Sequence, residues 1–398
     1  MTTNTVKNKK YIVKYKAITI YKRENVMKRI YNYLKKDAVL TISWVLAIIS
    51  MLFIKPDKAY AGYIDWRSLG ILWSLMIITK GYMQNGIFEK IGHALLARTR
   101  KMWQLIAVLV GLNFFSSMII TNDVSLITFV PFAIMMLKQC GRQELMIPVV
   151  VLQTIAANLG SMLTPIGNPQ NLYLYGLAGT GIGEFIMWLL PYTIASALLL
   201  VISILLIKNK NEIICIEDTD SEAAHNTSVP RVMAYSVLFV LALLVVARVL
   251  TWYILAAAVL ITVLLLEKNV LAKADYALLL TFIGFFIFTG NMGRVEPVAH
   301  FLAGIVNGRE LEAGIITSQC ISNVPAALLL SEFTDNIKNL AIGVNIGGLG
   351  TLIASMASLI SYKLYANEVP EKKGKYFAAF TVYNIIFLVV LYVFTKLI

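Results

Sequence analysis

The sequence contains little charge and few residues able to hold a metal or form a disulfide. Only 14% of its 398 residues are charged, and it has three cysteines and three histidines. Cys140, Cys215 and Cys320 are isolated from one another and from the histidines, so metal-ligand spacing and a disulfide framework are both absent. The apolar segments show no metal triad or nucleophile–base pair, which disfavours an intramembrane enzyme. We expect neither an enzyme nor a bound cofactor.

Long apolar runs take the place of the missing charge. Hydrophobic residues make up 58% of the chain, and the mean hydropathy is +0.73. These values exclude an ordinary soluble domain and predict a multi-pass protein of the cell membrane, with the lipid bilayer as its first partner. No cleavage site of the Ala-x-Ala kind follows the apolar run 37–54, so we expect that run to remain as the first span.

The basic excess is concentrated at the start of the chain. The net charge is +13, but residues 1–36 hold 11 of the 35 basic residues and a single acid, Glu24. We interpret residues 1–36 as a basic cytoplasmic tail that obeys the positive-inside rule, and we expect no nucleic-acid partner; nucleic acid or a specific lipid is the alternative. A Met-Lys-Arg run at 27–29 leads directly into the first span, so residues 1–26 also fit a non-native extension.

Apolar length and charge breaks predict an all-α fold. The predicted spans are 37–54, 66–83, 145–175, 184–207, 232–250, 252–266, 275–291, 337–363 and 376–397, with hairpins at 102–138 and 312–333. With a cytoplasmic N-terminus, most basic residues between spans fall inside. This topology places the C-terminus outside and lets the two hairpins enter from opposite faces.

The stretch Ala157 to Leu172 interrupts an apolar segment. It contains Pro165, Gly167 and Pro169 within five residues. In hydrocarbon such a break is tolerated only where protein or a polar cavity surrounds it, because the freed backbone groups need partners. Broken helices near the middle of the membrane offer helix ends and amides to ions and substrates, a pattern typical of transporters.

The pattern occurs a second time without the prolines. One constant offset pairs Asn158 with Asn345, Thr164 with Thr351, Asn168 with Ser355 and Leu172 with Leu359. Upstream, a polar interruption at 120–123 corresponds to one at 321–325, and Asp65 and Asp275 each lead an apolar run. Matched landmarks in the same order predict an internal repeat.

We therefore predict a polytopic membrane protein with two inverted repeats, 37–207 and 232–398, each with a re-entrant hairpin and a broken transmembrane helix. The polar, acidic segment 208–231 is predicted to be a cytoplasmic linker between them. Segments 84–101 and 293–310 mix apolar with charged residues, which predicts interfacial helices.

The two hairpin tips carry side chains suited to a small cation. Hydroxyl, amide and carboxylate oxygens beside free backbone carbonyls are hard ligands for an ion such as sodium. The predicted ion-binding residues are Thr121, Asn122, Asp123, Ser322 and Asn323. A carboxylate inside a membrane is costly unless it is used, so we interpret Asp123 as the place of sodium or proton coupling, with a structural hydrogen-bonding role as the alternative.

Substrate contact is predicted at the tips and the broken turns. The candidate residues are Asn122, Thr164, Gly167, Asn168, Ser322, Asn323, Thr351 and Ser355. Asn158 and Asn345 either line the site or cap hairpin backbone. Because the tips and broken turns contain no Arg or Lys, an anion would be held by helix N-termini, hydroxyls and amides. Lys80 either meets an anion or snorkels to the headgroups, and His93 and His300 either relay protons or belong to interfacial helices.

Four runs of residues resemble a known family. They are Thr-Asn-Asp at 121–123, Leu-Thr-Pro-Ile-Gly-Asn-Pro-Gln-Asn at 163–171, Ser-Gln-x-Ile-Ser-Asn-Val-Pro at 318–325 and Asn-Ile-Gly-Gly-Leu-Gly-Thr at 345–351. Over about 37–398 the chain resembles the citrate-permease group of the ion transporter superfamily, related to divalent-anion/sodium symporters and arsenite permeases. The resemblance implies a scaffold domain, a mobile transport domain and a possible homodimer.

The paired Ser-Asn-Thr signatures of the symporters fall on 121–123 and 322–324. Asp123 replaces a neutral threonine and Val324 removes a hydroxyl, which implies a departure from the dicarboxylate site of those symporters. Our first hypothesis is a secondary active permease for a small anion such as a carboxylate or oxyanion, coupled to sodium or protons. A sodium/proton antiporter and an arsenite-type efflux permease are the alternatives.

Overall fold

The chain folds entirely into helices over the part that the structure describes. The computed structural model describes residues 38–96, 99–207, 212 and 228–398, and no strand occurs among them. Six described helices are long and apolar enough to cross a membrane: Met102–Ile120, Gln143–Ser161, Ile182–Leu206, Val229–Val246, Tyr276–Gly293 and Pro370–Thr395. The all-α, multi-pass prediction is confirmed. The tail 1–36 and nearly all of the linker 208–231 lie outside the described residues.

The first half of the chain holds nine α-helices within its described residues. They are α2 (Ala38–Ser50), α3 (Tyr60–Tyr63), α4 (Trp66–Gln84), α5 (Ile87–Leu96), α6 (Met102–Ile120), α7 (Asn122–Gln139), α8 (Met146–Ser161), α9 (Pro169–Ala178) and α10 (Ile182–Leu206). The irregular stretch 162–168 separates α8 from α9, so the interruption expected from the prolines is present.

The described residues of the second half form nine further α-helices. They are α11 (Val229–Val246), α12 (Trp252–Leu266), α13 (Tyr276–Gly293), α14 (Glu296–Val306), α15 (Glu310–Ile321), α16 (Asn323–Leu330), α17 (Ile337–Ile346), α18 (Met356–Glu368) and α19 (Lys373–Thr395). The stretch 347–355 separates α17 from α18, although it contains no proline.

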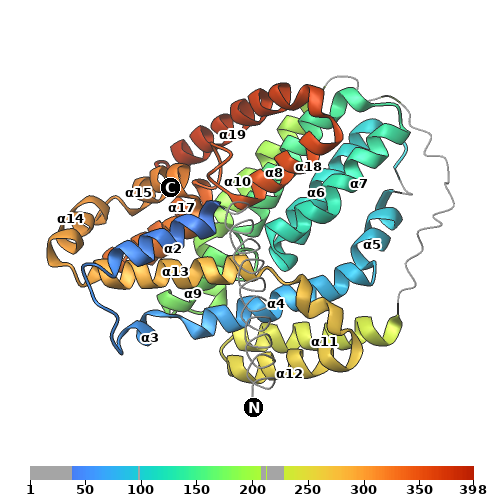
Figure 1. Cartoon of the computed structure of the whole chain (residues 1–398). Helices are drawn as coiled ribbons and strands as arrows, with labels where there is room; N and C mark the ends of the chain where they lie inside the picture. Colours follow the sequence, from blue (N-terminus) through green and yellow to red (C-terminus); the bar gives the residue numbers. More distant parts are fainter. Residues whose placement is uncertain (1–37, 97–98, 208–211, 213–227) are drawn as a thin grey trace, which may run out of the picture.

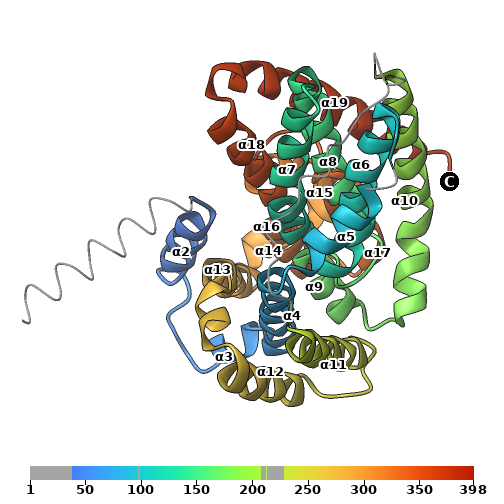
Figure 2. The same ribbon diagram turned by 90° about the vertical axis from the view of Figure 1, so that its right-hand side faces the viewer.

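The helices form two groups that meet along α9 and α16. One group packs α4 against α11 and α12, and α13 against α2. The other packs α6, α7 and α8 together and joins them to α10, α18 and α19. Figures 1 and 2 show the first group along one side of the molecule and the second along the other. Helix α9 contacts α4 and α17, and α16 contacts α13 and α17. Because α17 contacts α8, α10 and α19, each short helix links the two groups.

The apolar runs after Asp65 and Asp275 begin with the same cap. Asp65 accepts a hydrogen bond from the Ser68 N–H at 3.0 Å, and Asp275 accepts one from the Leu278 N–H at 3.0 Å. An N-cap aspartate satisfies a free helix N–H and contributes about 0.5–2 kcal/mol. The two predicted landmarks therefore fix the starts of α4 and α13.

Small residues let the broken helices approach their neighbours closely. A Cβ added at Gly160 in α8 would overlap the carbonyl oxygen of Phe114 in α6. A Cβ added at Gly347, just after α17, would lie 2.8 Å from the Cα of Ile315 in α15. Such approaches favour packing between membrane helices, where burial in place of lipid gives little driving force. They hold α8 against α6 and α17 against α15.

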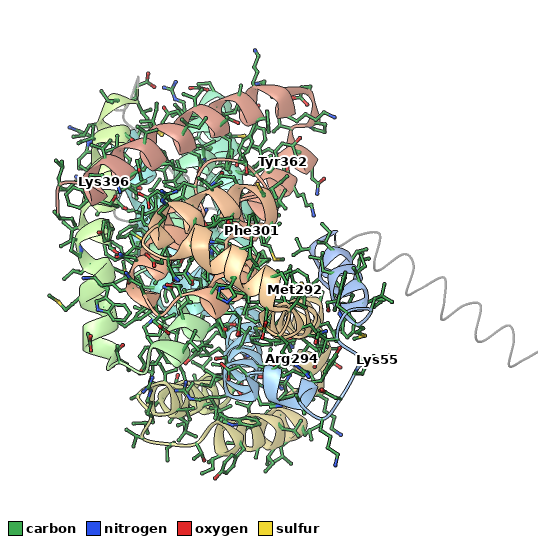
Figure 3. All side chains as sticks on the ribbon, turned by 90° about the vertical axis from the view of Figure 1, so that its left-hand side faces the viewer. Lys55, Met292, Arg294, Phe301, Tyr362 and Lys396 are labelled. Carbon is green, nitrogen blue, oxygen red and sulfur yellow. The ribbon has the colours of Figure 1, made fainter. Side chains whose placement is uncertain are left out.

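Two arginines, Arg248 and Arg294, form hydrogen bonds with loops and helix ends. Arg248 donates to the carbonyls of Tyr175 at 3.2 Å and Gly179 at 2.8 Å, where its charge complements the C-terminal end of α9. Arg294 follows α13 and donates to Asp57 at 2.9 Å (Figure 3), and this pairing holds the pKa of the Asp57 carboxyl below its ordinary value. These contacts fix the loops that flank the two groups.

Candidate functional site

Each of the pairs α6–α7 and α15–α16 is joined through one residue with an unusual backbone. Thr121 has φ 71° and ψ 150°, and Ser322 has φ 76° and ψ 153°. This region is nearly exclusive to glycine, and another residue in it costs on the order of 1–3 kcal/mol. The two residues therefore need surrounding contacts that hold them, and we call these junctions the first and second tips.

Each tip docks on a broken segment through its backbone. The Asn122 N–H donates to the carbonyl of Gly167 at 3.2 Å, and the Asn323 N–H donates to the carbonyl of Ala354 at 2.9 Å. The two acceptors are related by the same sequence offset that aligns the broken segments. The first tip thus meets the break between α8 and α9, and the second meets the break between α17 and α18.

A threonine in each broken segment binds the helix that precedes the tip. Thr164 Oγ1 donates to the Met118 carbonyl at 2.5 Å, and Thr351 Oγ1 donates to the Gln319 carbonyl at 3.3 Å. Thr164 is half-buried, whereas Thr351 is exposed. The two contacts correspond in position but differ in length and in access to the surroundings.

Asn158 connects the first tip to the second broken segment. Its Oδ1 accepts from Asn122 Nδ2 at 3.1 Å and from Ser355 Oγ at 3.0 Å, and its Nδ2 donates to Ser358 Oγ at 3.3 Å. All four side chains are at least 95% buried. Buried amides and hydroxyls that satisfy one another in this way specify one arrangement of the helices that carry them.

Asn345 makes the corresponding connection to the first broken segment. Its Oδ1 accepts from Asn168 Nδ2 at 3.1 Å, and its Nδ2 donates to Asn171 Oδ1 at 2.6 Å and to the Ala341 carbonyl at 2.8 Å. Asn171 Nδ2 in turn donates to the carbonyl of Met162 at 2.8 Å. The side chains of Asn158 and Asn345 thus bond mainly to the opposite broken segment, and we call the two sets of bonds the asparagine network.

Four helices begin in or next to this network. They are α7, α9, α16 and α18, which start at the two tips and after the two breaks. Asn168 is the N-cap of α9 and accepts from the Asn171 N–H at 2.9 Å, while Pro169 occupies the first helical position, where no N–H is needed. Helix N-termini carry partial positive charge and free N–H groups, so their convergence favours an anion.

Asp123 is the one ionisable residue at the tips. It follows Asn122 in the first turn of α7, its N–H donates to Asn122 Oδ1 at 3.0 Å, and its side chain is partly buried. None of the ion pairs found in the described part of the chain includes it. Lys80 and Asp275 lie within Coulombic range of it. The Lys80 ammonium contacts only the Met83 sulfur, at 3.9 Å, among the hydrogen bonds of the described residues.

Two buried oxygens beside the network have no hydrogen-bond partner among the described residues. They are Ser322 Oγ, at the second tip, and Gln170 Oε1, in the first turn of α9. Their residues are 1% and 2% exposed, respectively. A buried polar atom without a partner is uncommon and marks a place where an ion, water or substrate atom can supply the missing bond.

The structure gathers most of the predicted site residues. Asn122, Gly167, Asn168, Ser322, Asn323 and Ser355 lie in or next to the asparagine network. Thr121 and Asp123 flank Asn122, while Thr164 and Thr351 lie further out against the preceding helices. The sequence argument did not single out Asn171, Ser358 and Gln319. The offset that pairs Asn168 with Ser355 also pairs Asn171 with Ser358, and that signal identifies these two residues but not Gln319.

The predicted histidines lie away from the network. The His93 ring packs edge-on against Phe132 at 5.0 Å, and His300 lines a separate polar pocket of about 420 Å³ beside Glu332. The described residues contain no group of three or more His, Cys, Asp or Glu side chains able to hold a metal ion. The network itself offers amide, hydroxyl and carbonyl oxygens, which are suited to sodium rather than to a transition metal.

Comparison with known proteins places this site in a family. A family model described as a citrate transporter, CitMHS, matches residues 30–339. The uncharacterized transporter MJ0456 of Methanocaldococcus jannaschii is 31% identical over 361 residues, which cover 90% of this chain and 97% of its own. The inner membrane protein YbiR of Escherichia coli is 30% identical over 81% of this chain and 87% of its own.

A third relative is similar over a shorter stretch. The silicon efflux transporter LSI3 of Oryza sativa subsp. japonica is 30% identical over 152 residues, or 37% of this chain and 30% of its own. The family match and the two longer relatives, in contrast, cover most of this chain. The chain therefore belongs to the CitMHS citrate transporter family and is a multi-pass membrane transport protein.

Proposed function

We propose that this protein is a secondary active transporter that moves a small anion, a carboxylate or an oxyanion, with sodium or protons as the coupling ion. The observation that carries the proposal is the asparagine network, in which the first tip and the two breaks join buried amides and hydroxyls, while the second tip docks beside it on the second break. Four helices begin in or next to this network. Amide and carbonyl oxygens suit a small cation, and helix N-termini suit an anion. A bound cation would add the positive charge that the network lacks.

The proposal includes two inverted repeats, 37–207 and 232–398, joined by the cytoplasmic linker 208–231. Its support is the matched set of contacts: tip to break, threonine to preceding helix, and asparagine to opposite break. These six bonds form three pairs, and the residues of each pair occupy corresponding positions in the two halves of the chain. Two unrelated halves would not be expected to share these positions. In this arrangement α6–α7 and α15–α16 are re-entrant hairpins that enter from opposite faces, as inverted repeats require.

In the proposed mechanism each predicted residue has a role. Thr121, Asn122, Asp123, Ser322 and Asn323 provide oxygens for the coupling ion at the two tips. The breaks contribute Gly167, Asn168, Thr164, Thr351 and Ser355 to the substrate. The unpartnered Ser322 Oγ is the most available of these ligands. The first group of helices would act as a scaffold and the second would carry the site across the membrane.

The proposed orientation has the N-terminus in the cytoplasm and the C-terminus outside the cell membrane. A test places single cysteines at Ser221, which lies outside the described residues, and at Asn307, after removal of the native cysteines. A membrane-impermeant thiol reagent should label Ser221→Cys only from the cytoplasmic side and Asn307→Cys only from outside. Labelling of both from one face would contradict the inverted repeats. A homodimer, which the family resemblance implies, is tested by the mass of the purified particle in detergent.

The function itself is tested with purified protein in liposomes. Imposed sodium or pH gradients should drive uptake of a labelled member of a panel containing citrate, succinate, arsenite and silicate. The Asn122→Ala protein, inserted at equal density, is the matched control and should be inactive. Uptake that ignores both gradients, or that survives in the control, would contradict the proposal.

A sodium/proton antiporter is the second candidate, because Asp123 places one carboxylate at the tip and none of the ion pairs found among the described residues includes it. Such a protein would change the internal pH in response to a sodium gradient without any of the anions. An arsenite-type efflux permease is a variant of the first proposal. It is favoured by the relative named a silicon efflux transporter and by the lack of a fixed cation in the network, which suits a weakly charged oxyacid.

A further inference from the structure

A large apolar groove lies between the two groups of helices, apart from the asparagine network. Its volume is about 790 Å³, within the range of about 300–1,000 Å³ typical of ligand sites. The walls come from α4, α5, α6, α7 and α11, and Figure 2 shows α5 between α6 and α7 on one side and α4 and α11 on the other. The groove reaches Ile120, the residue before the first tip.

The groove offers nothing to a small anion. Its hydroxyls belong to Tyr82, Ser116 and Ser236, and each already has a partner. Tyr82 bonds to Ser236 at 3.0 Å, Ser236 donates to the Val232 carbonyl at 2.9 Å, and Ser116 bonds to Ser125 at 2.8 Å. The remaining lining is aliphatic, aromatic or glycine. The part of an occupant that lies in the groove must therefore be apolar.

The groove is continuous with the outer apolar surface. Phe115 and Ile119 of α6 line it and are 66% and 50% exposed, and Ile91 of α5 lines it and is 46% exposed. Helix α5 presents Ile87, Phe88, Ile91 and Leu95 to the groove, whereas Lys90 is exposed. An amphipathic helix of this kind lies at the level of the lipid headgroups, so the space beneath its apolar face is at the depth of acyl chains.

Exposed basic residues lie close in sequence to helices that line the groove. Arg100 and Lys101 are exposed just before α6, and Arg231, with its side chain 45% exposed, directly precedes the lining residue Val232. Arg231 also pairs with the buried Glu267 at 2.8 Å. Basic groups at the mouth of an apolar cleft between membrane helices suit the phosphate of an anionic lipid.

We propose that this groove binds one anionic phospholipid from the leaflet next to α5. An acyl chain fills the groove as far as Ile120, and the headgroup lies near Arg100, Lys101 and Arg231. The site goes beyond the transport function and does not require it. Because the groove separates α6 and α7 from α4 and α11, the lipid would also separate the two groups of helices close to the first tip.

The test places a large side chain in the groove, at a position where an added Cβ meets no neighbour. A Cβ added at Gly111 meets no atom within 4 Å, so Gly111→Phe places a ring in the groove without a backbone clash. Gly183 in α10 is equally open and lies outside the groove, so Gly183→Phe is the matched control. Each full-length protein is purified in mild detergent, incubated with mixed micelles of phosphatidylglycerol and phosphatidylcholine, and examined by native mass spectrometry.

The wild type and Gly183→Phe should retain one phosphatidylglycerol, and Gly111→Phe should retain roughly tenfold less, as expected from lost contact with about two methylenes. Arg100→Gln with Lys101→Gln should keep a bound lipid but lose the preference for phosphatidylglycerol. Equal retention by Gly111→Phe and the wild type would overturn the proposal, as would no preference in the wild type. Ala107→Phe, also in the lining, replaces Gly111→Phe if that protein melts at a lower temperature than the control.

Discussion

The two tip-and-break units of the molecule, α6–α9 and α15–α18, make corresponding contacts with different side chains. In the first break, Pro165 and Pro169 restrict the backbone, and Pro169 starts α9. The second break has no proline. There Gln319 of α15 donates to the carbonyls of Gly347 at 2.8 Å and Leu349 at 2.9 Å and accepts from the Thr351 N–H at 2.9 Å.

The difference shows that the two breaks, which interrupt their helices at corresponding positions, are held in place by different physical means. Proline fixes φ in the unfolded chain as well, so the first turn loses less entropy on folding. The second turn is fixed only in the folded state, through hydrogen bonds from a side chain on another helix. The second unit therefore depends on α15 staying in place, whereas the first carries part of its shape in its own sequence.

The strongest test of this comparison removes the asparagines that join the units. Asn158→Ala leaves Asn122 and Ser355 without their acceptor, and Asn345→Ala leaves Asn171 Oδ1 without its donor. Each buried group left without a partner costs about 1–3 kcal/mol, so we expect uptake to fall by about tenfold to a hundredfold in both variants. Uptake into liposomes, corrected for inserted protein, measures the loss.

Asn384→Ala is the matched control for both asparagines. Asn384 is fully buried in α19 and donates only to the Phe380 carbonyl of its own helix among the described residues. It should leave uptake within about a factor of three of the wild type, the effect of about 0.6 kcal/mol. A drop in the control as large as in Asn158→Ala would mean that loss of a buried amide, rather than of the network, causes the defect.

The next test concerns the charge that distinguishes the tips, Asp123 in the first against Val324 in the second. If the Asp123 carboxylate binds the coupling ion, Asp123→Asn keeps one oxygen ligand and removes the charge. Apparent sodium affinity should fall roughly tenfold or more, the equivalent of one charge-assisted contact of about 1.5–3 kcal/mol. Protons compete for the wild-type carboxylate, so its sodium affinity should weaken as pH falls, and the variant should lack that dependence.

Sodium dependence of uptake at several pH values, measured for both proteins, decides the role of Asp123. Superimposable pH profiles would remove it from ion coupling. A structural aspartate would instead lower the melting temperature of Asp123→Asn and leave the sodium profile unchanged. The two outcomes separate the alternatives that the sequence left open for this residue.

Much of the fold could be predicted from the sequence, because the lengths of apolar runs and the residues that cap or interrupt helices are local signals. Asp65 and Asp275 mark the starts of two helices, and the prolines at 165 and 169 mark the first break. The second break was found only through its constant offset from the first, since glycine and small residues alone do not predict an interruption. Family and transport class followed from the same motifs.

The partners of the site residues could not be predicted, because they depend on packing between distant segments. The sequence left Asn158 and Asn345 between lining the site and capping hairpin backbone, whereas the structure joins their side chains to the opposite break. Gln319 stood in a quoted motif without a role. Its three hydrogen bonds to residues 347–351 exist only once α15 lies against the second break. A sequence shows that an amide side chain is present, but it does not show which groups that amide bonds to.

A stability comparison sharpens the contrast between the two turns. Gln319→Ala should lower the free energy of unfolding by about 2 kcal/mol, since three hydrogen bonds of about 0.6 kcal/mol each to the second break are lost. Pro165→Ala should cost only about 0.4–1 kcal/mol, because its effect is on the entropy of the unfolded chain. Thermal denaturation in detergent measures both losses. A larger loss for Pro165→Ala than for Gln319→Ala would show that the proline stabilises the first turn more than the side-chain bonds stabilise the second.

The smallest expected effect comes from the paired threonines. Thr164→Val removes a 2.5 Å bond to Met118 from a half-buried position, and should lower stability by about 0.6 kcal/mol or somewhat more. Thr351→Val removes a 3.3 Å bond from an exposed position and should change stability very little. Its effect on transport is then the informative result. If Thr351→Val slows uptake while the melting temperature stays constant, its hydroxyl serves the transported species, because the lost bond contributes nothing measurable to folding. Thr351→Ser should then restore uptake by returning the hydroxyl. Equal losses of stability in the two valine variants would show that the corresponding bonds are equivalent in strength. The two units would then differ only in how the turns of their breaks are held, by proline in the first and by Gln319 in the second.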